Sequence, residues 1–326
     1  MEEALRVGVV GAGPWAHRMH GPGLAAHECT RLAAVWARRP EAARELAQRH
    51  GAAVAPHFDA LLDSVDAVAF AVPPEVQAEL APRAARAGKH LILEKPLAAD
   101  LSGAREVADA VLDARVAGLV VLTRRYSPEV RQWLAGVRGA GGWRGGTGRW
   151  LAGGLLDGDQ PVSPWRRVEG ALLDAGPHAI DLLDAALGRI ERVHYAHHGD
   201  DDLWQVVFGH AGGATSTLSL SLKLPVQPSV VDFAVYGEHG HAPLTGRRTA
   251  ARECYASLLD DFVAMIYHQD LEHPCDVRRG LHLQRVITDV RAAAWRATAP
   301  SAAAAPHGGP DRPLGRPVRR RVQERC

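Results

Sequence analysis

Lysine is scarce in this sequence. Only Lys89, Lys95 and Lys223 are lysine, so the other 35 of the 38 basic positions are arginine. Lysine, unlike arginine, can change its protonation state in a protein and so give or take a proton. A lysine that such an arginine-rich chain keeps beside a buried strand is therefore a candidate for proton transfer. A cation that only closes the end of a strand is the plainer alternative.

The chain also has few cysteines and a small net charge. The four cysteines of the 326 residues are far apart and form no Cys-x-x-Cys or Cys/His cluster of zinc spacing, which indicates free thiols and no metal site. A net charge of +1 provides no overall field that would recruit nucleic acid or an anionic membrane. The chain also lacks a signal core and any apolar run long enough to span a bilayer, so we expect a soluble protein that stays in the cytoplasm.

Lys95 follows an apolar run, residues 91–93, that ends abruptly in Glu94-Lys95-Pro96. An uninterrupted apolar run bounded by charge is typical of a strand that is buried on both faces of a parallel sheet. Ligands of such sheets bind beyond the carboxyl ends of the strands. Lys95 is therefore expected where the chemistry takes place.

The start of the chain has the pattern of a dinucleotide site. An apolar strand over residues 5–10 leads into a glycine turn and a helix to about residue 27, the order in which G-x-G-x-x-G/A binds a pyrophosphate. Gly11 allows the turn, Gly13 lets the backbone approach phosphate, and Ala16 keeps helix and strand close. The expected cofactor contacts here are Gly11, Ala12, Gly13, Pro14, Trp15 and Ala16.

The second strand, residues 32–36, lacks the acid that normally follows it. An Asp or Glu at this point grips the ribose 2′-OH of NAD, but Arg38 and Arg39 stand here instead. Arginine accommodates a 2′-phosphate through charge-assisted hydrogen bonds. We therefore predict that NADP(H) is preferred over NAD(H), with plain solvated charge as the alternative.

Composition and periodicity divide the chain into three parts. Apolar strands alternate with helices of ten to fifteen residues up to residue 122, which predicts a Rossmann-type, doubly wound parallel sheet. Longer alternating strands at 204–208, 215–224 and 230–236 predict a second α/β domain, 123–298, with an open, mostly antiparallel sheet. The last part, 299–326, is rich in Ala, Pro, Gly and Arg and is predicted to be a disordered tail.

Two segments of the second domain carry candidate ligand-binding residues. Residues 139–169 are rich in Gly, Trp and Arg with weak periodicity, as in a binding loop. In the following helical pattern Asp174, His178 and Asp181 are spaced to share one face. Pro177 favours a helix that begins near Gly176, which would leave Asp174 on the preceding turn and His178 in the first turn, where the helix dipole favours a neutral imidazole.

Several motifs occur in a fixed order along residues 5–297. They are the glycine turn, Val72-Pro73-Pro74, Ala87-Gly88-Lys89-His90 leading to Glu94-Lys95-Pro96, Arg124-Arg125-Tyr126-Ser127-Pro128, the segment 170–181, Tyr236-Gly237-Glu238-His239-Gly240, and two final helices. Taken together they resemble the Gfo/Idh/MocA family, named for glucose-fructose oxidoreductase, inositol dehydrogenase and a rhizopine catabolism protein. The resemblance implies a nucleotide-binding domain followed by an α/β domain whose open sheet supports a homo-oligomer, a dimer or tetramer.

The resemblance also implies roles for individual residues. Lys95 and His178 would handle the proton, with Asp174 orienting or tuning them. The implied additional cofactor contacts are Val72, Pro73, Pro74, Glu94 and Lys95, and the implied substrate contacts are Tyr126, Trp165, Arg166 and His178. Gln77 and Thr123 depart from the His and Asn that many members have, at positions that line the cleft in relatives.

The leading hypothesis is an NAD(P)-dependent oxidoreductase that transfers hydride between nicotinamide C4 and a carbonyl or hydroxyl carbon of a small sugar-like or polyol substrate. A dinucleotide-binding sensor or scaffold without turnover is the first alternative. The second is an imine or ketone reductase of natural-product biosynthesis, since Trp143, Trp150 and Trp165 would suit a less polar substrate. Packing in the core is an equally good interpretation of these tryptophans.

Overall fold

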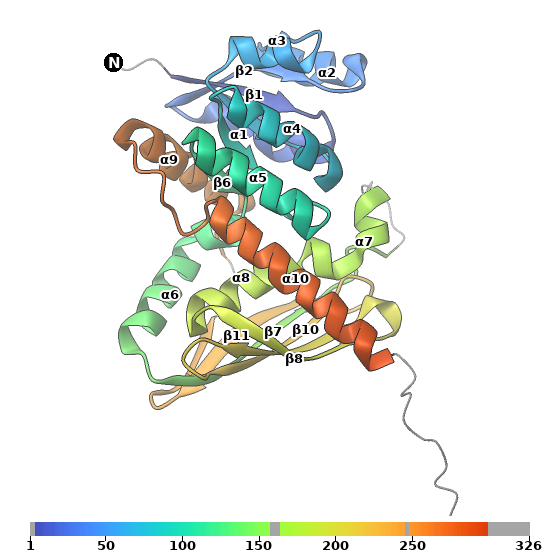
Figure 1. Cartoon of the computed structure of the whole chain (residues 1–326), viewed down its shortest axis with the longest axis vertical. Helices are drawn as coiled ribbons and strands as arrows, with labels where there is room; N and C mark the ends of the chain where they lie inside the picture. Colours follow the sequence, from blue (N-terminus) through green and yellow to red (C-terminus); the bar gives the residue numbers. More distant parts are fainter. Residues whose placement is uncertain (1–3, 157–163, 245–247, 299–326) are drawn as a thin grey trace, which may run out of the picture.

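The first half of the chain forms a six-stranded parallel sheet with the order β3-β2-β1-β4-β5-β6. The computed structural model describes residues 4–156, 164–244 and 248–298. This sheet order confirms the doubly wound Rossmann topology (Figure 1). The strands are β1 (Leu5–Val10), β2 (Thr30–Trp36), β3 (Ala53–Val54), β4 (Ala67–Phe70), β5 (His90–Leu93) and β6 (Gly118–Val120).

Helices follow each strand of this sheet, as the alternation predicted. The turn after β1 enters a short π-helix, η1 (Ala16–His20), before α1 (Gly21–Ala26). The short strand β3 has no counterpart among the predicted strands, because it is only two residues long and both of them are exposed. The remaining helices are α2 (Pro40–His50), α3 (Phe58–Ser64), α4 (Pro74–Arg86) and α5 (Leu101–Ala114).

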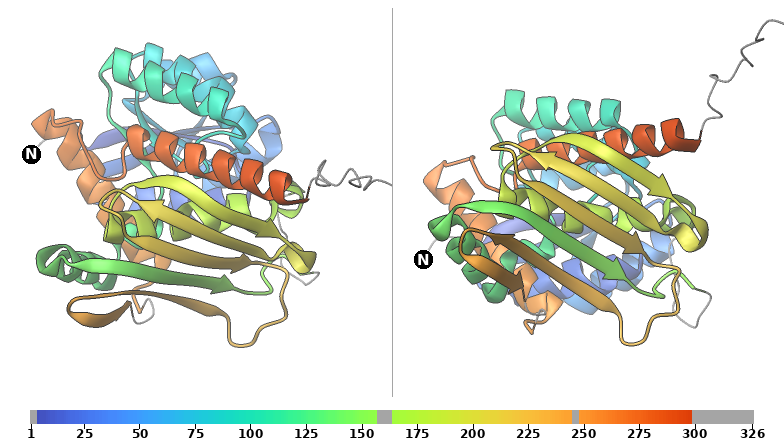
Figure 2. Two further views of the ribbon diagram at one scale, coloured as in Figure 1. Left: turned by 60° about the horizontal axis from the view of Figure 1, so that its bottom comes forward. Right: turned by 90° about the horizontal axis from the view of Figure 1, so that it is seen from below.

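A second six-stranded sheet has the order β12-β11-β7-β10-β9-β8, in which only β7 and β10 pair in parallel. The predicted mostly antiparallel sheet is therefore confirmed. Figure 2 shows helices on one face of this sheet and no helix of the described chain in front of the other. The strands are β7 (Trp143–Leu151), β8 (Ile190–His198), β9 (Trp204–His210), β10 (Thr215–Ser221), β11 (Val230–Gly237) and β12 (Gly240–Leu244).

The prediction of a binding loop over residues 139–169 is wrong for residues 143–151, which form the central strand β7, and for residues 164–169, which are helical. Residues 157–163 lie outside the described residues. Glycine hides the strand from pattern analysis because it contributes no side chain to the alternation. A Cβ on Gly145 would lie 2.5 Å from the ring of Tyr236, and one on Gly148 would lie 2.8 Å from the ring of Phe233. Aromatic rings of β11 thus cover the glycines of β7.

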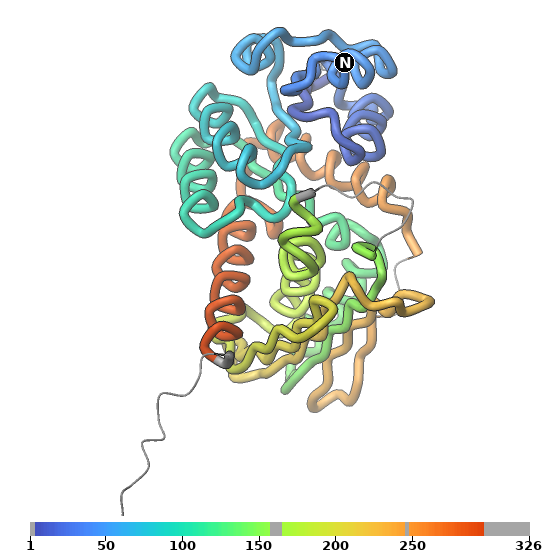
Figure 3. The backbone as a smooth tube through the Cα atoms, turned by 90° about the vertical axis from the view of Figure 1, so that its right-hand side faces the viewer, coloured from blue at the N-terminus to red at the C-terminus, as the bar shows by residue number. Residues whose placement is uncertain are grey.

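The other elements lie outside the two sheets. They are η2 (Thr123–Tyr126), α6 (Pro128–Ala140), α7 (Pro164–Asp174), α8 (Gly176–Leu187), η3 (Asp200–Asp202), α9 (Ala251–His268) and α10 (Val277–Thr298). Of these, η2 and α6 form the connection between the two sheets. After the second sheet the chain returns to the first half, and the backbone trace of α9 runs below the N-terminal segment (Figure 3). A Cβ on Gly23 would lie 2.5 Å from the Tyr255 ring, so α1 and α9 pack closely.

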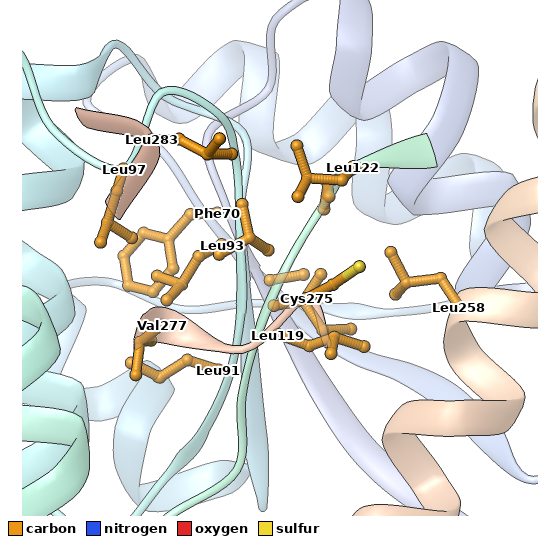
Figure 4. Packing of buried hydrophobic residues seen from close by; sticks show 14 of the residues in the cluster. Phe70, Leu91, Leu93, Leu97, Leu119, Leu122, Leu258, Cys275, Val277 and Leu283 are labelled. Atoms are coloured by element: carbon orange, nitrogen blue, oxygen red, sulfur yellow. The ribbon is translucent and has the colours of Figure 1, made fainter. Parts of the chain in front are cut away.

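The C-terminal part of the chain also completes the core of the first sheet. The amide of Val120 donates to the carbonyl of Cys275 at 2.9 Å, which adds one more backbone segment to the edge at β6. Figure 4 shows Cys275, Val277 and Leu283 packed against side chains of β4, β5 and β6. A division of the chain at residue 122, which stays a prediction, would therefore still leave the first domain dependent on residues near 275.

Of the cysteines in the described chain, Cys29 and Cys275 are free thiols, as predicted. None of the helices described here combines the length and the hydropathy needed to cross a bilayer.

The predicted tail, 299–326, lies outside the described residues. We expect a truncation that ends at Pro300 to keep the solubility and the oligomer size of the full chain, because the composition of the tail cannot bury enough apolar surface to offset its ordering. Size-exclusion chromatography of the two proteins would measure this. A shift in elution or precipitation of the short form would contradict the prediction.

Candidate active site

A cavity of about 1490 Å³ lies between the two halves of the chain. One wall is made by the loops at the carboxyl ends of β1, β2, β4 and β5, as expected for a parallel sheet. The opposite wall comes from the end of β7 and from α7 and α8. Of the predicted site residues, those lining the cavity are Gly11, Ala12, Gly13, Pro14, Trp15, Arg38, Arg39, Val72, Pro73, Pro74, Glu94, Lys95, Trp165, Arg166, Asp174 and His178.

The glycine turn has the form that a pyrophosphate requires. Gly11 has a φ of +102°, and a Cβ there would lie 2.4 Å from the carbonyl oxygen of Ala71. A Cβ on Gly13 would meet nothing within 4 Å, so this backbone faces open space into which a phosphate fits. Ala16 is fully buried beneath the turn rather than in the cavity wall, in keeping with its predicted role between helix and strand.

Arg38 and Arg39 are exposed at the edge of the cavity, beyond the end of β2. Because no carboxylate stands directly after β2, the chain offers two guanidinium groups where a ribose hydroxyl would otherwise be gripped. The arrangement fits a 2′-phosphate.

Lys95 is held by Asp174 across the cavity. Its Nζ donates to the Asp174 carbonyl oxygen at 2.7 Å and to Oδ1 of the same residue at 2.9 Å. The second carboxylate oxygen, Oδ2, accepts from Nε of Arg166 at 2.8 Å and from its terminal nitrogen. The Lys95 side chain is 15% exposed and that of Asp174 6%. The two residues, 79 positions apart, thus form a largely buried ion pair.

The charge state of Asp174 follows from its neighbours. Burial by itself raises the pKa of this carboxyl group, but Lys95 and then Arg166 outweigh burial and lower the pKa from 3.8 to about 2. Asp174 is therefore a carboxylate throughout the physiological range. It keeps the ammonium of Lys95 in one position.

One buried side chain outside the predicted site residues, that of Gln77, holds the loop that carries Lys95. Gln77 accepts from the amide of Glu94 at 2.8 Å and donates to the carbonyls of Glu94 and Leu97, both at 2.9 Å. Gln77 is fully buried and is not among the cavity-lining residues. Having Gln instead of His at this position therefore affects the loop that carries Lys95 rather than the cleft. Thr123 does line the cavity.

The carboxylate of Glu94 is oriented in the same way. Its Oε1 accepts from Nε1 of Trp15 at 2.6 Å and lies 2.9 Å from Nε2 of His20. The other ring nitrogen of His20 lies 2.8 Å from the Tyr255 hydroxyl. Burial raises the pKa of Tyr255, so its hydroxyl keeps its proton and can either donate to or accept from this ring nitrogen. His20 gave no signal in the sequence, since its partners are 74 and 235 residues away.

His178 lies at the start of α8, as predicted. The helix α7 ends at Asp174 and α8 begins at Gly176, so the break near Pro177 is confirmed and Asp174 lies on the preceding turn. The His178 ring is stacked on Trp150, with centroids 6.0 Å apart and an angle of 21° between the planes. Trp150 and Arg124 also line the cavity. The guanidinium carbon of Arg124 lies 4.2 Å from the centroid of the Trp150 ring.

Three residues of the sequence analysis lie away from the cavity. Tyr126, implied as a substrate contact, is 1% exposed and stacks on His273 instead of lining the cavity. Asp181 does not share the orientation of Asp174 and His178, because it pairs with Arg125 at 3.0 Å and with Arg279 at 2.6 Å. Trp143 donates to the carbonyl of Val137 at 2.6 Å outside the cavity. Partners remote in sequence decide the positions of Tyr126 and Asp181.

The hydrogen bonds of Asp174 determine which neighbouring residue we expect to be coupled to it in a double-mutant cycle. The sequence predicts non-additive losses for Asp174 and His178 provided that the carboxylate reaches the ring, yet both of its oxygens accept from Lys95 and Arg166. We expect Lys95→Ala and Asp174→Asn each to cost most of what the double variant costs in kcat/KM. The losses in kcat/KM caused by Asp174→Asn and His178→Ala should be closer to additive in the double variant. Additive losses for Lys95 and Asp174 would show that the ion pair has no role in turnover.

No group of His, Cys, Asp or Glu in the described ranges could hold a metal ion.

Two sequence models of one family match the chain. The first, described as an oxidoreductase family with an NAD-binding Rossmann fold, matches residues 5–121, and the second, the C-terminal domain of the same family, matches residues 146–242. Together they cover well over half of the chain.

Curated relatives match over a shorter stretch. A dTDP-3,4-didehydro-2,6-dideoxy-alpha-D-glucose 3-reductase from Streptomyces violaceoruber is 41% identical over 120 residues, which are 36% of this chain and 34% of the relative. A levoglucosan dehydrogenase from Pseudarthrobacter phenanthrenivorans is 33% identical over 48% of this chain and 42% of its own. The chain thus matches less than half of the length of these relatives.

Solved structures show the same fold. A levoglucosan dehydrogenase in complex with NADH and L-sorbose has a TM-score of 0.80 at 20% identity, over 90% of this chain and 98% of that one. A 3-ketoreductase from Actinomadura kijaniata in complex with NADP has a TM-score of 0.72 at 22% identity, over 89% and 98%. The two family models and the cavity between a Rossmann domain and an open sheet lead to one conclusion: this chain belongs to the Gfo/Idh/MocA oxidoreductase family.

Proposed function

We propose that this protein is an NADP-dependent oxidoreductase that interconverts a hydroxyl and a carbonyl group on a sugar-like substrate. The observation that carries the proposal is the ion pair of Lys95 and Asp174, 2.9 Å apart, in the wall of the cavity that also contains the glycine turn. The named relatives, sugar reductases and dehydrogenases, support the substrate class.

The residues of this chain would divide the reaction between them. When bound, the nicotinamide cofactor supplies or accepts the hydride. Reduction of a carbonyl leaves negative charge on the substrate oxygen, and Lys95 is the group that we propose donates a proton to that oxygen. His178 would hydrogen bond to the same oxygen, and Asp174 would hold Lys95 in position. In the oxidative direction the same groups accept the hydroxyl proton.

We also propose that the cofactor is bound by the glycine turn, by Arg38 and Arg39, by Val72-Pro73-Pro74 and by the Glu94-Lys95 loop. Trp165, Arg166 and His178 are the proposed substrate contacts. The face of the second sheet that no described helix covers is the proposed surface for assembly into a homo-oligomer (Figure 2).

A second candidate keeps the fold and changes the substrate. Trp150 and Trp165 line the cavity and would suit a less polar ketone or imine. The abundance of charged groups beside them, Lys95, Arg166 and Asp174, favours the sugar-like substrate instead.

The test is a turnover assay of the purified protein. Keto-sugars with NADPH and sugars or polyols with NADP⁺ would be compared with a cyclic imine and an apolar ketone, and the change in nicotinamide absorbance recorded. We expect turnover of at least one sugar-like compound, and turnover at least about a hundredfold slower by the Lys95→Ala variant at the same protein concentration. Binding of NADPH without turnover of any compound would instead favour the sensor or scaffold alternative.

A further inference from the structure

His20 is fully buried behind the wall of the cavity, and both nitrogens of its ring have partners. Nε2 lies 2.9 Å from Oε1 of Glu94, and Nδ1 lies 2.8 Å from the hydroxyl of Tyr255. Because a carboxylate oxygen can only accept, Nε2 carries the hydrogen of the first of these bonds. The proposed reaction gives no role to this buried histidine.

The helix that follows the glycine turn is widened at His20. The amide of Gly21 donates to the carbonyl of Ala16, five residues earlier, so η1 is a π-turn between α-helical residues. In an α-helix, side chains five positions apart point about 140° away from each other. Here Trp15 and His20, which are five positions apart, both reach Oε1 of Glu94, at 2.6 and 2.9 Å. Turns of this kind are rare and frequently lie at functional sites.

The helix α9 fixes the ring of His20 from the other side. Tyr255 is fully buried, and its ring lies edge-on to the His20 ring, with centroids 5.2 Å apart and an angle of 86° between the planes. Gly23 leaves room for Tyr255 on the N-terminal helix, since a Cβ there would lie 2.5 Å from the tyrosine ring. The orientation of His20, and through it that of Glu94, therefore depends on a residue 235 positions away.

The carboxylate that is held in this way faces the cavity. Glu94 lines the cavity directly beyond β5, and its side chain is 13% exposed. Oε1 accepts the hydrogen bonds of both Trp15 and His20. Oε2 accepts none from the described residues and yet is not a buried atom, so it is open to the cavity.

The order of the strands indicates which half of a bound cofactor Glu94 would meet. The strands lie side by side in the order β2, β1, β4 and β5. With the adenosine ribose at Arg38 and Arg39 beyond β2 and the pyrophosphate at the glycine turn beyond β1, the rest of the dinucleotide would extend over the ends of β4 and β5. Glu94 follows β5 and precedes Lys95, so its carboxylate would meet the nicotinamide ribose.

We infer that His20 is a positioning residue for the nicotinamide half of the cofactor. It acts through Glu94: the Nε2–H of His20 and the indole N–H of Trp15 hold Oε1, so that Oε2 faces a hydroxyl group of the nicotinamide ribose. Tyr255, which is not among the cavity-lining residues, keeps the imidazole in the required orientation. The inference rests on the proposed function, in which the Glu94-Lys95 loop binds the cofactor.

The experiment measures, by isothermal titration, the dissociation constants of NADPH and of adenosine 2′,5′-bisphosphate, which lacks the nicotinamide ribose. His20→Leu removes both hydrogen bonds of the ring, and His20→Gln keeps a donor that can replace Nε2–H. Tyr255→Phe removes only the hydroxyl group. His210→Leu is the matched control, because His210 is 4% exposed and its nitrogens lie 2.7 and 2.8 Å from the Gly188 carbonyl and the Ser216 hydroxyl, in the second sheet.

We expect His20→Leu to raise the dissociation constant of NADPH about 10-fold to 100-fold, in line with a lost hydrogen bond to a charged group. That of adenosine 2′,5′-bisphosphate should stay within about twofold. His20→Gln should recover most of the NADPH affinity, and Tyr255→Phe should lose about threefold. His210→Leu should lower the melting temperature and leave both dissociation constants unchanged. NADH and ADP, compared in the same way, make the result independent of which dinucleotide is preferred.

A double-mutant cycle with Glu94→Gln separates positioning from a role in stability alone. If His20 acts through the carboxylate, His20→Leu should weaken NADPH binding by no more than about twofold in a chain that already carries Glu94→Gln. Additive losses would overturn the inference, and so would equal losses for NADPH and adenosine 2′,5′-bisphosphate in His20→Leu. If His20→Leu fails to fold, which thermal melting detects, Tyr255→Phe carries the same contrast between the two ligands.

None of these titrations needs a substrate. Failure of the inference therefore leaves the proposed function intact. A selective loss of NADPH binding in His20→Leu, together with no turnover of any compound by wild type, would support the role of His20 and refute the proposed function.

Discussion

Replacing Lys95 with alanine should lower kcat at least about a hundredfold, the low end of what a positioned general acid or base contributes. The ammonium of Lys95 is held between the carbonyl and the carboxylate of Asp174 at 2.7 and 2.9 Å, so it faces the cavity in one position. Alanine removes the proton donor without disturbing the glycine turn. The dissociation constant for NADPH, measured by fluorescence titration, should change little.

Lys89 provides the matched control for this variant. It is the other lysine of the first half of the chain, and its Nζ donates to the carbonyl of Val65 at 2.9 Å, away from the cavity. Lys89→Ala should keep turnover close to that of wild type. If Lys95→Ala also kept near wild-type turnover, Lys95 would be no more than the cation that ends strand β5.

Replacing Arg38 and Arg39 together with alanine should weaken NADP(H) binding about 10-fold to 100-fold and leave NAD(H) binding almost unchanged. Charge-assisted hydrogen bonds to the 2′-phosphate are the interactions that this variant removes, and solvent exposure of both arginines limits their strength. NAD(H) has a hydroxyl at this position and loses little. The selectivity for NADP(H) over NAD(H) should fall by the same factor.

Isothermal titration of both cofactors at two salt concentrations measures this effect. Arg44, on α2 and paired with Glu41, is exposed and outside the cavity, so Arg44→Ala removes a nearby positive charge without removing a proposed contact. It should leave both affinities unchanged. Equal losses for NADP(H) and NAD(H) in the double variant would show that Arg38 and Arg39 do not recognise the 2′-phosphate.

Local features of the fold could be predicted because the residues that cause them are neighbours in sequence. The strand, glycine turn and helix at residues 5–26 follow from an apolar run and the freedom of Gly11, and β5 follows from the buried run before Glu94. The break between α7 and α8 follows from Pro177, which suits a first helical turn. The sequence also predicted that Lys95 ends a buried strand at the ligand-binding edge of the sheet.

Other features depend on partners that are remote in sequence. The strand β7 shows little alternation of apolar and polar side chains, because rings of β11 occupy the space over two of its glycines. The apolar side chains that cover this part of the sheet therefore belong to the neighbouring strand. Similarly, the edge of the first sheet is completed by residues near 275, and Tyr255 orients His20 from a helix 235 positions away.

The cavity residues show most clearly which features follow from local sequence and which depend on tertiary contacts. Residue type and local spacing were sufficient to identify Lys95, Asp174 and His178 as candidates. Only the packing of one half of the chain on the other decided that both carboxylate oxygens of Asp174 accept hydrogen bonds from Lys95 and Arg166. The same packing buried Tyr126 beneath the cavity wall and brought Arg124 onto Trp150. A hydrogen bond or a stacked pair needs two groups in contact, and the distance between residues far apart in sequence is set by tertiary structure alone.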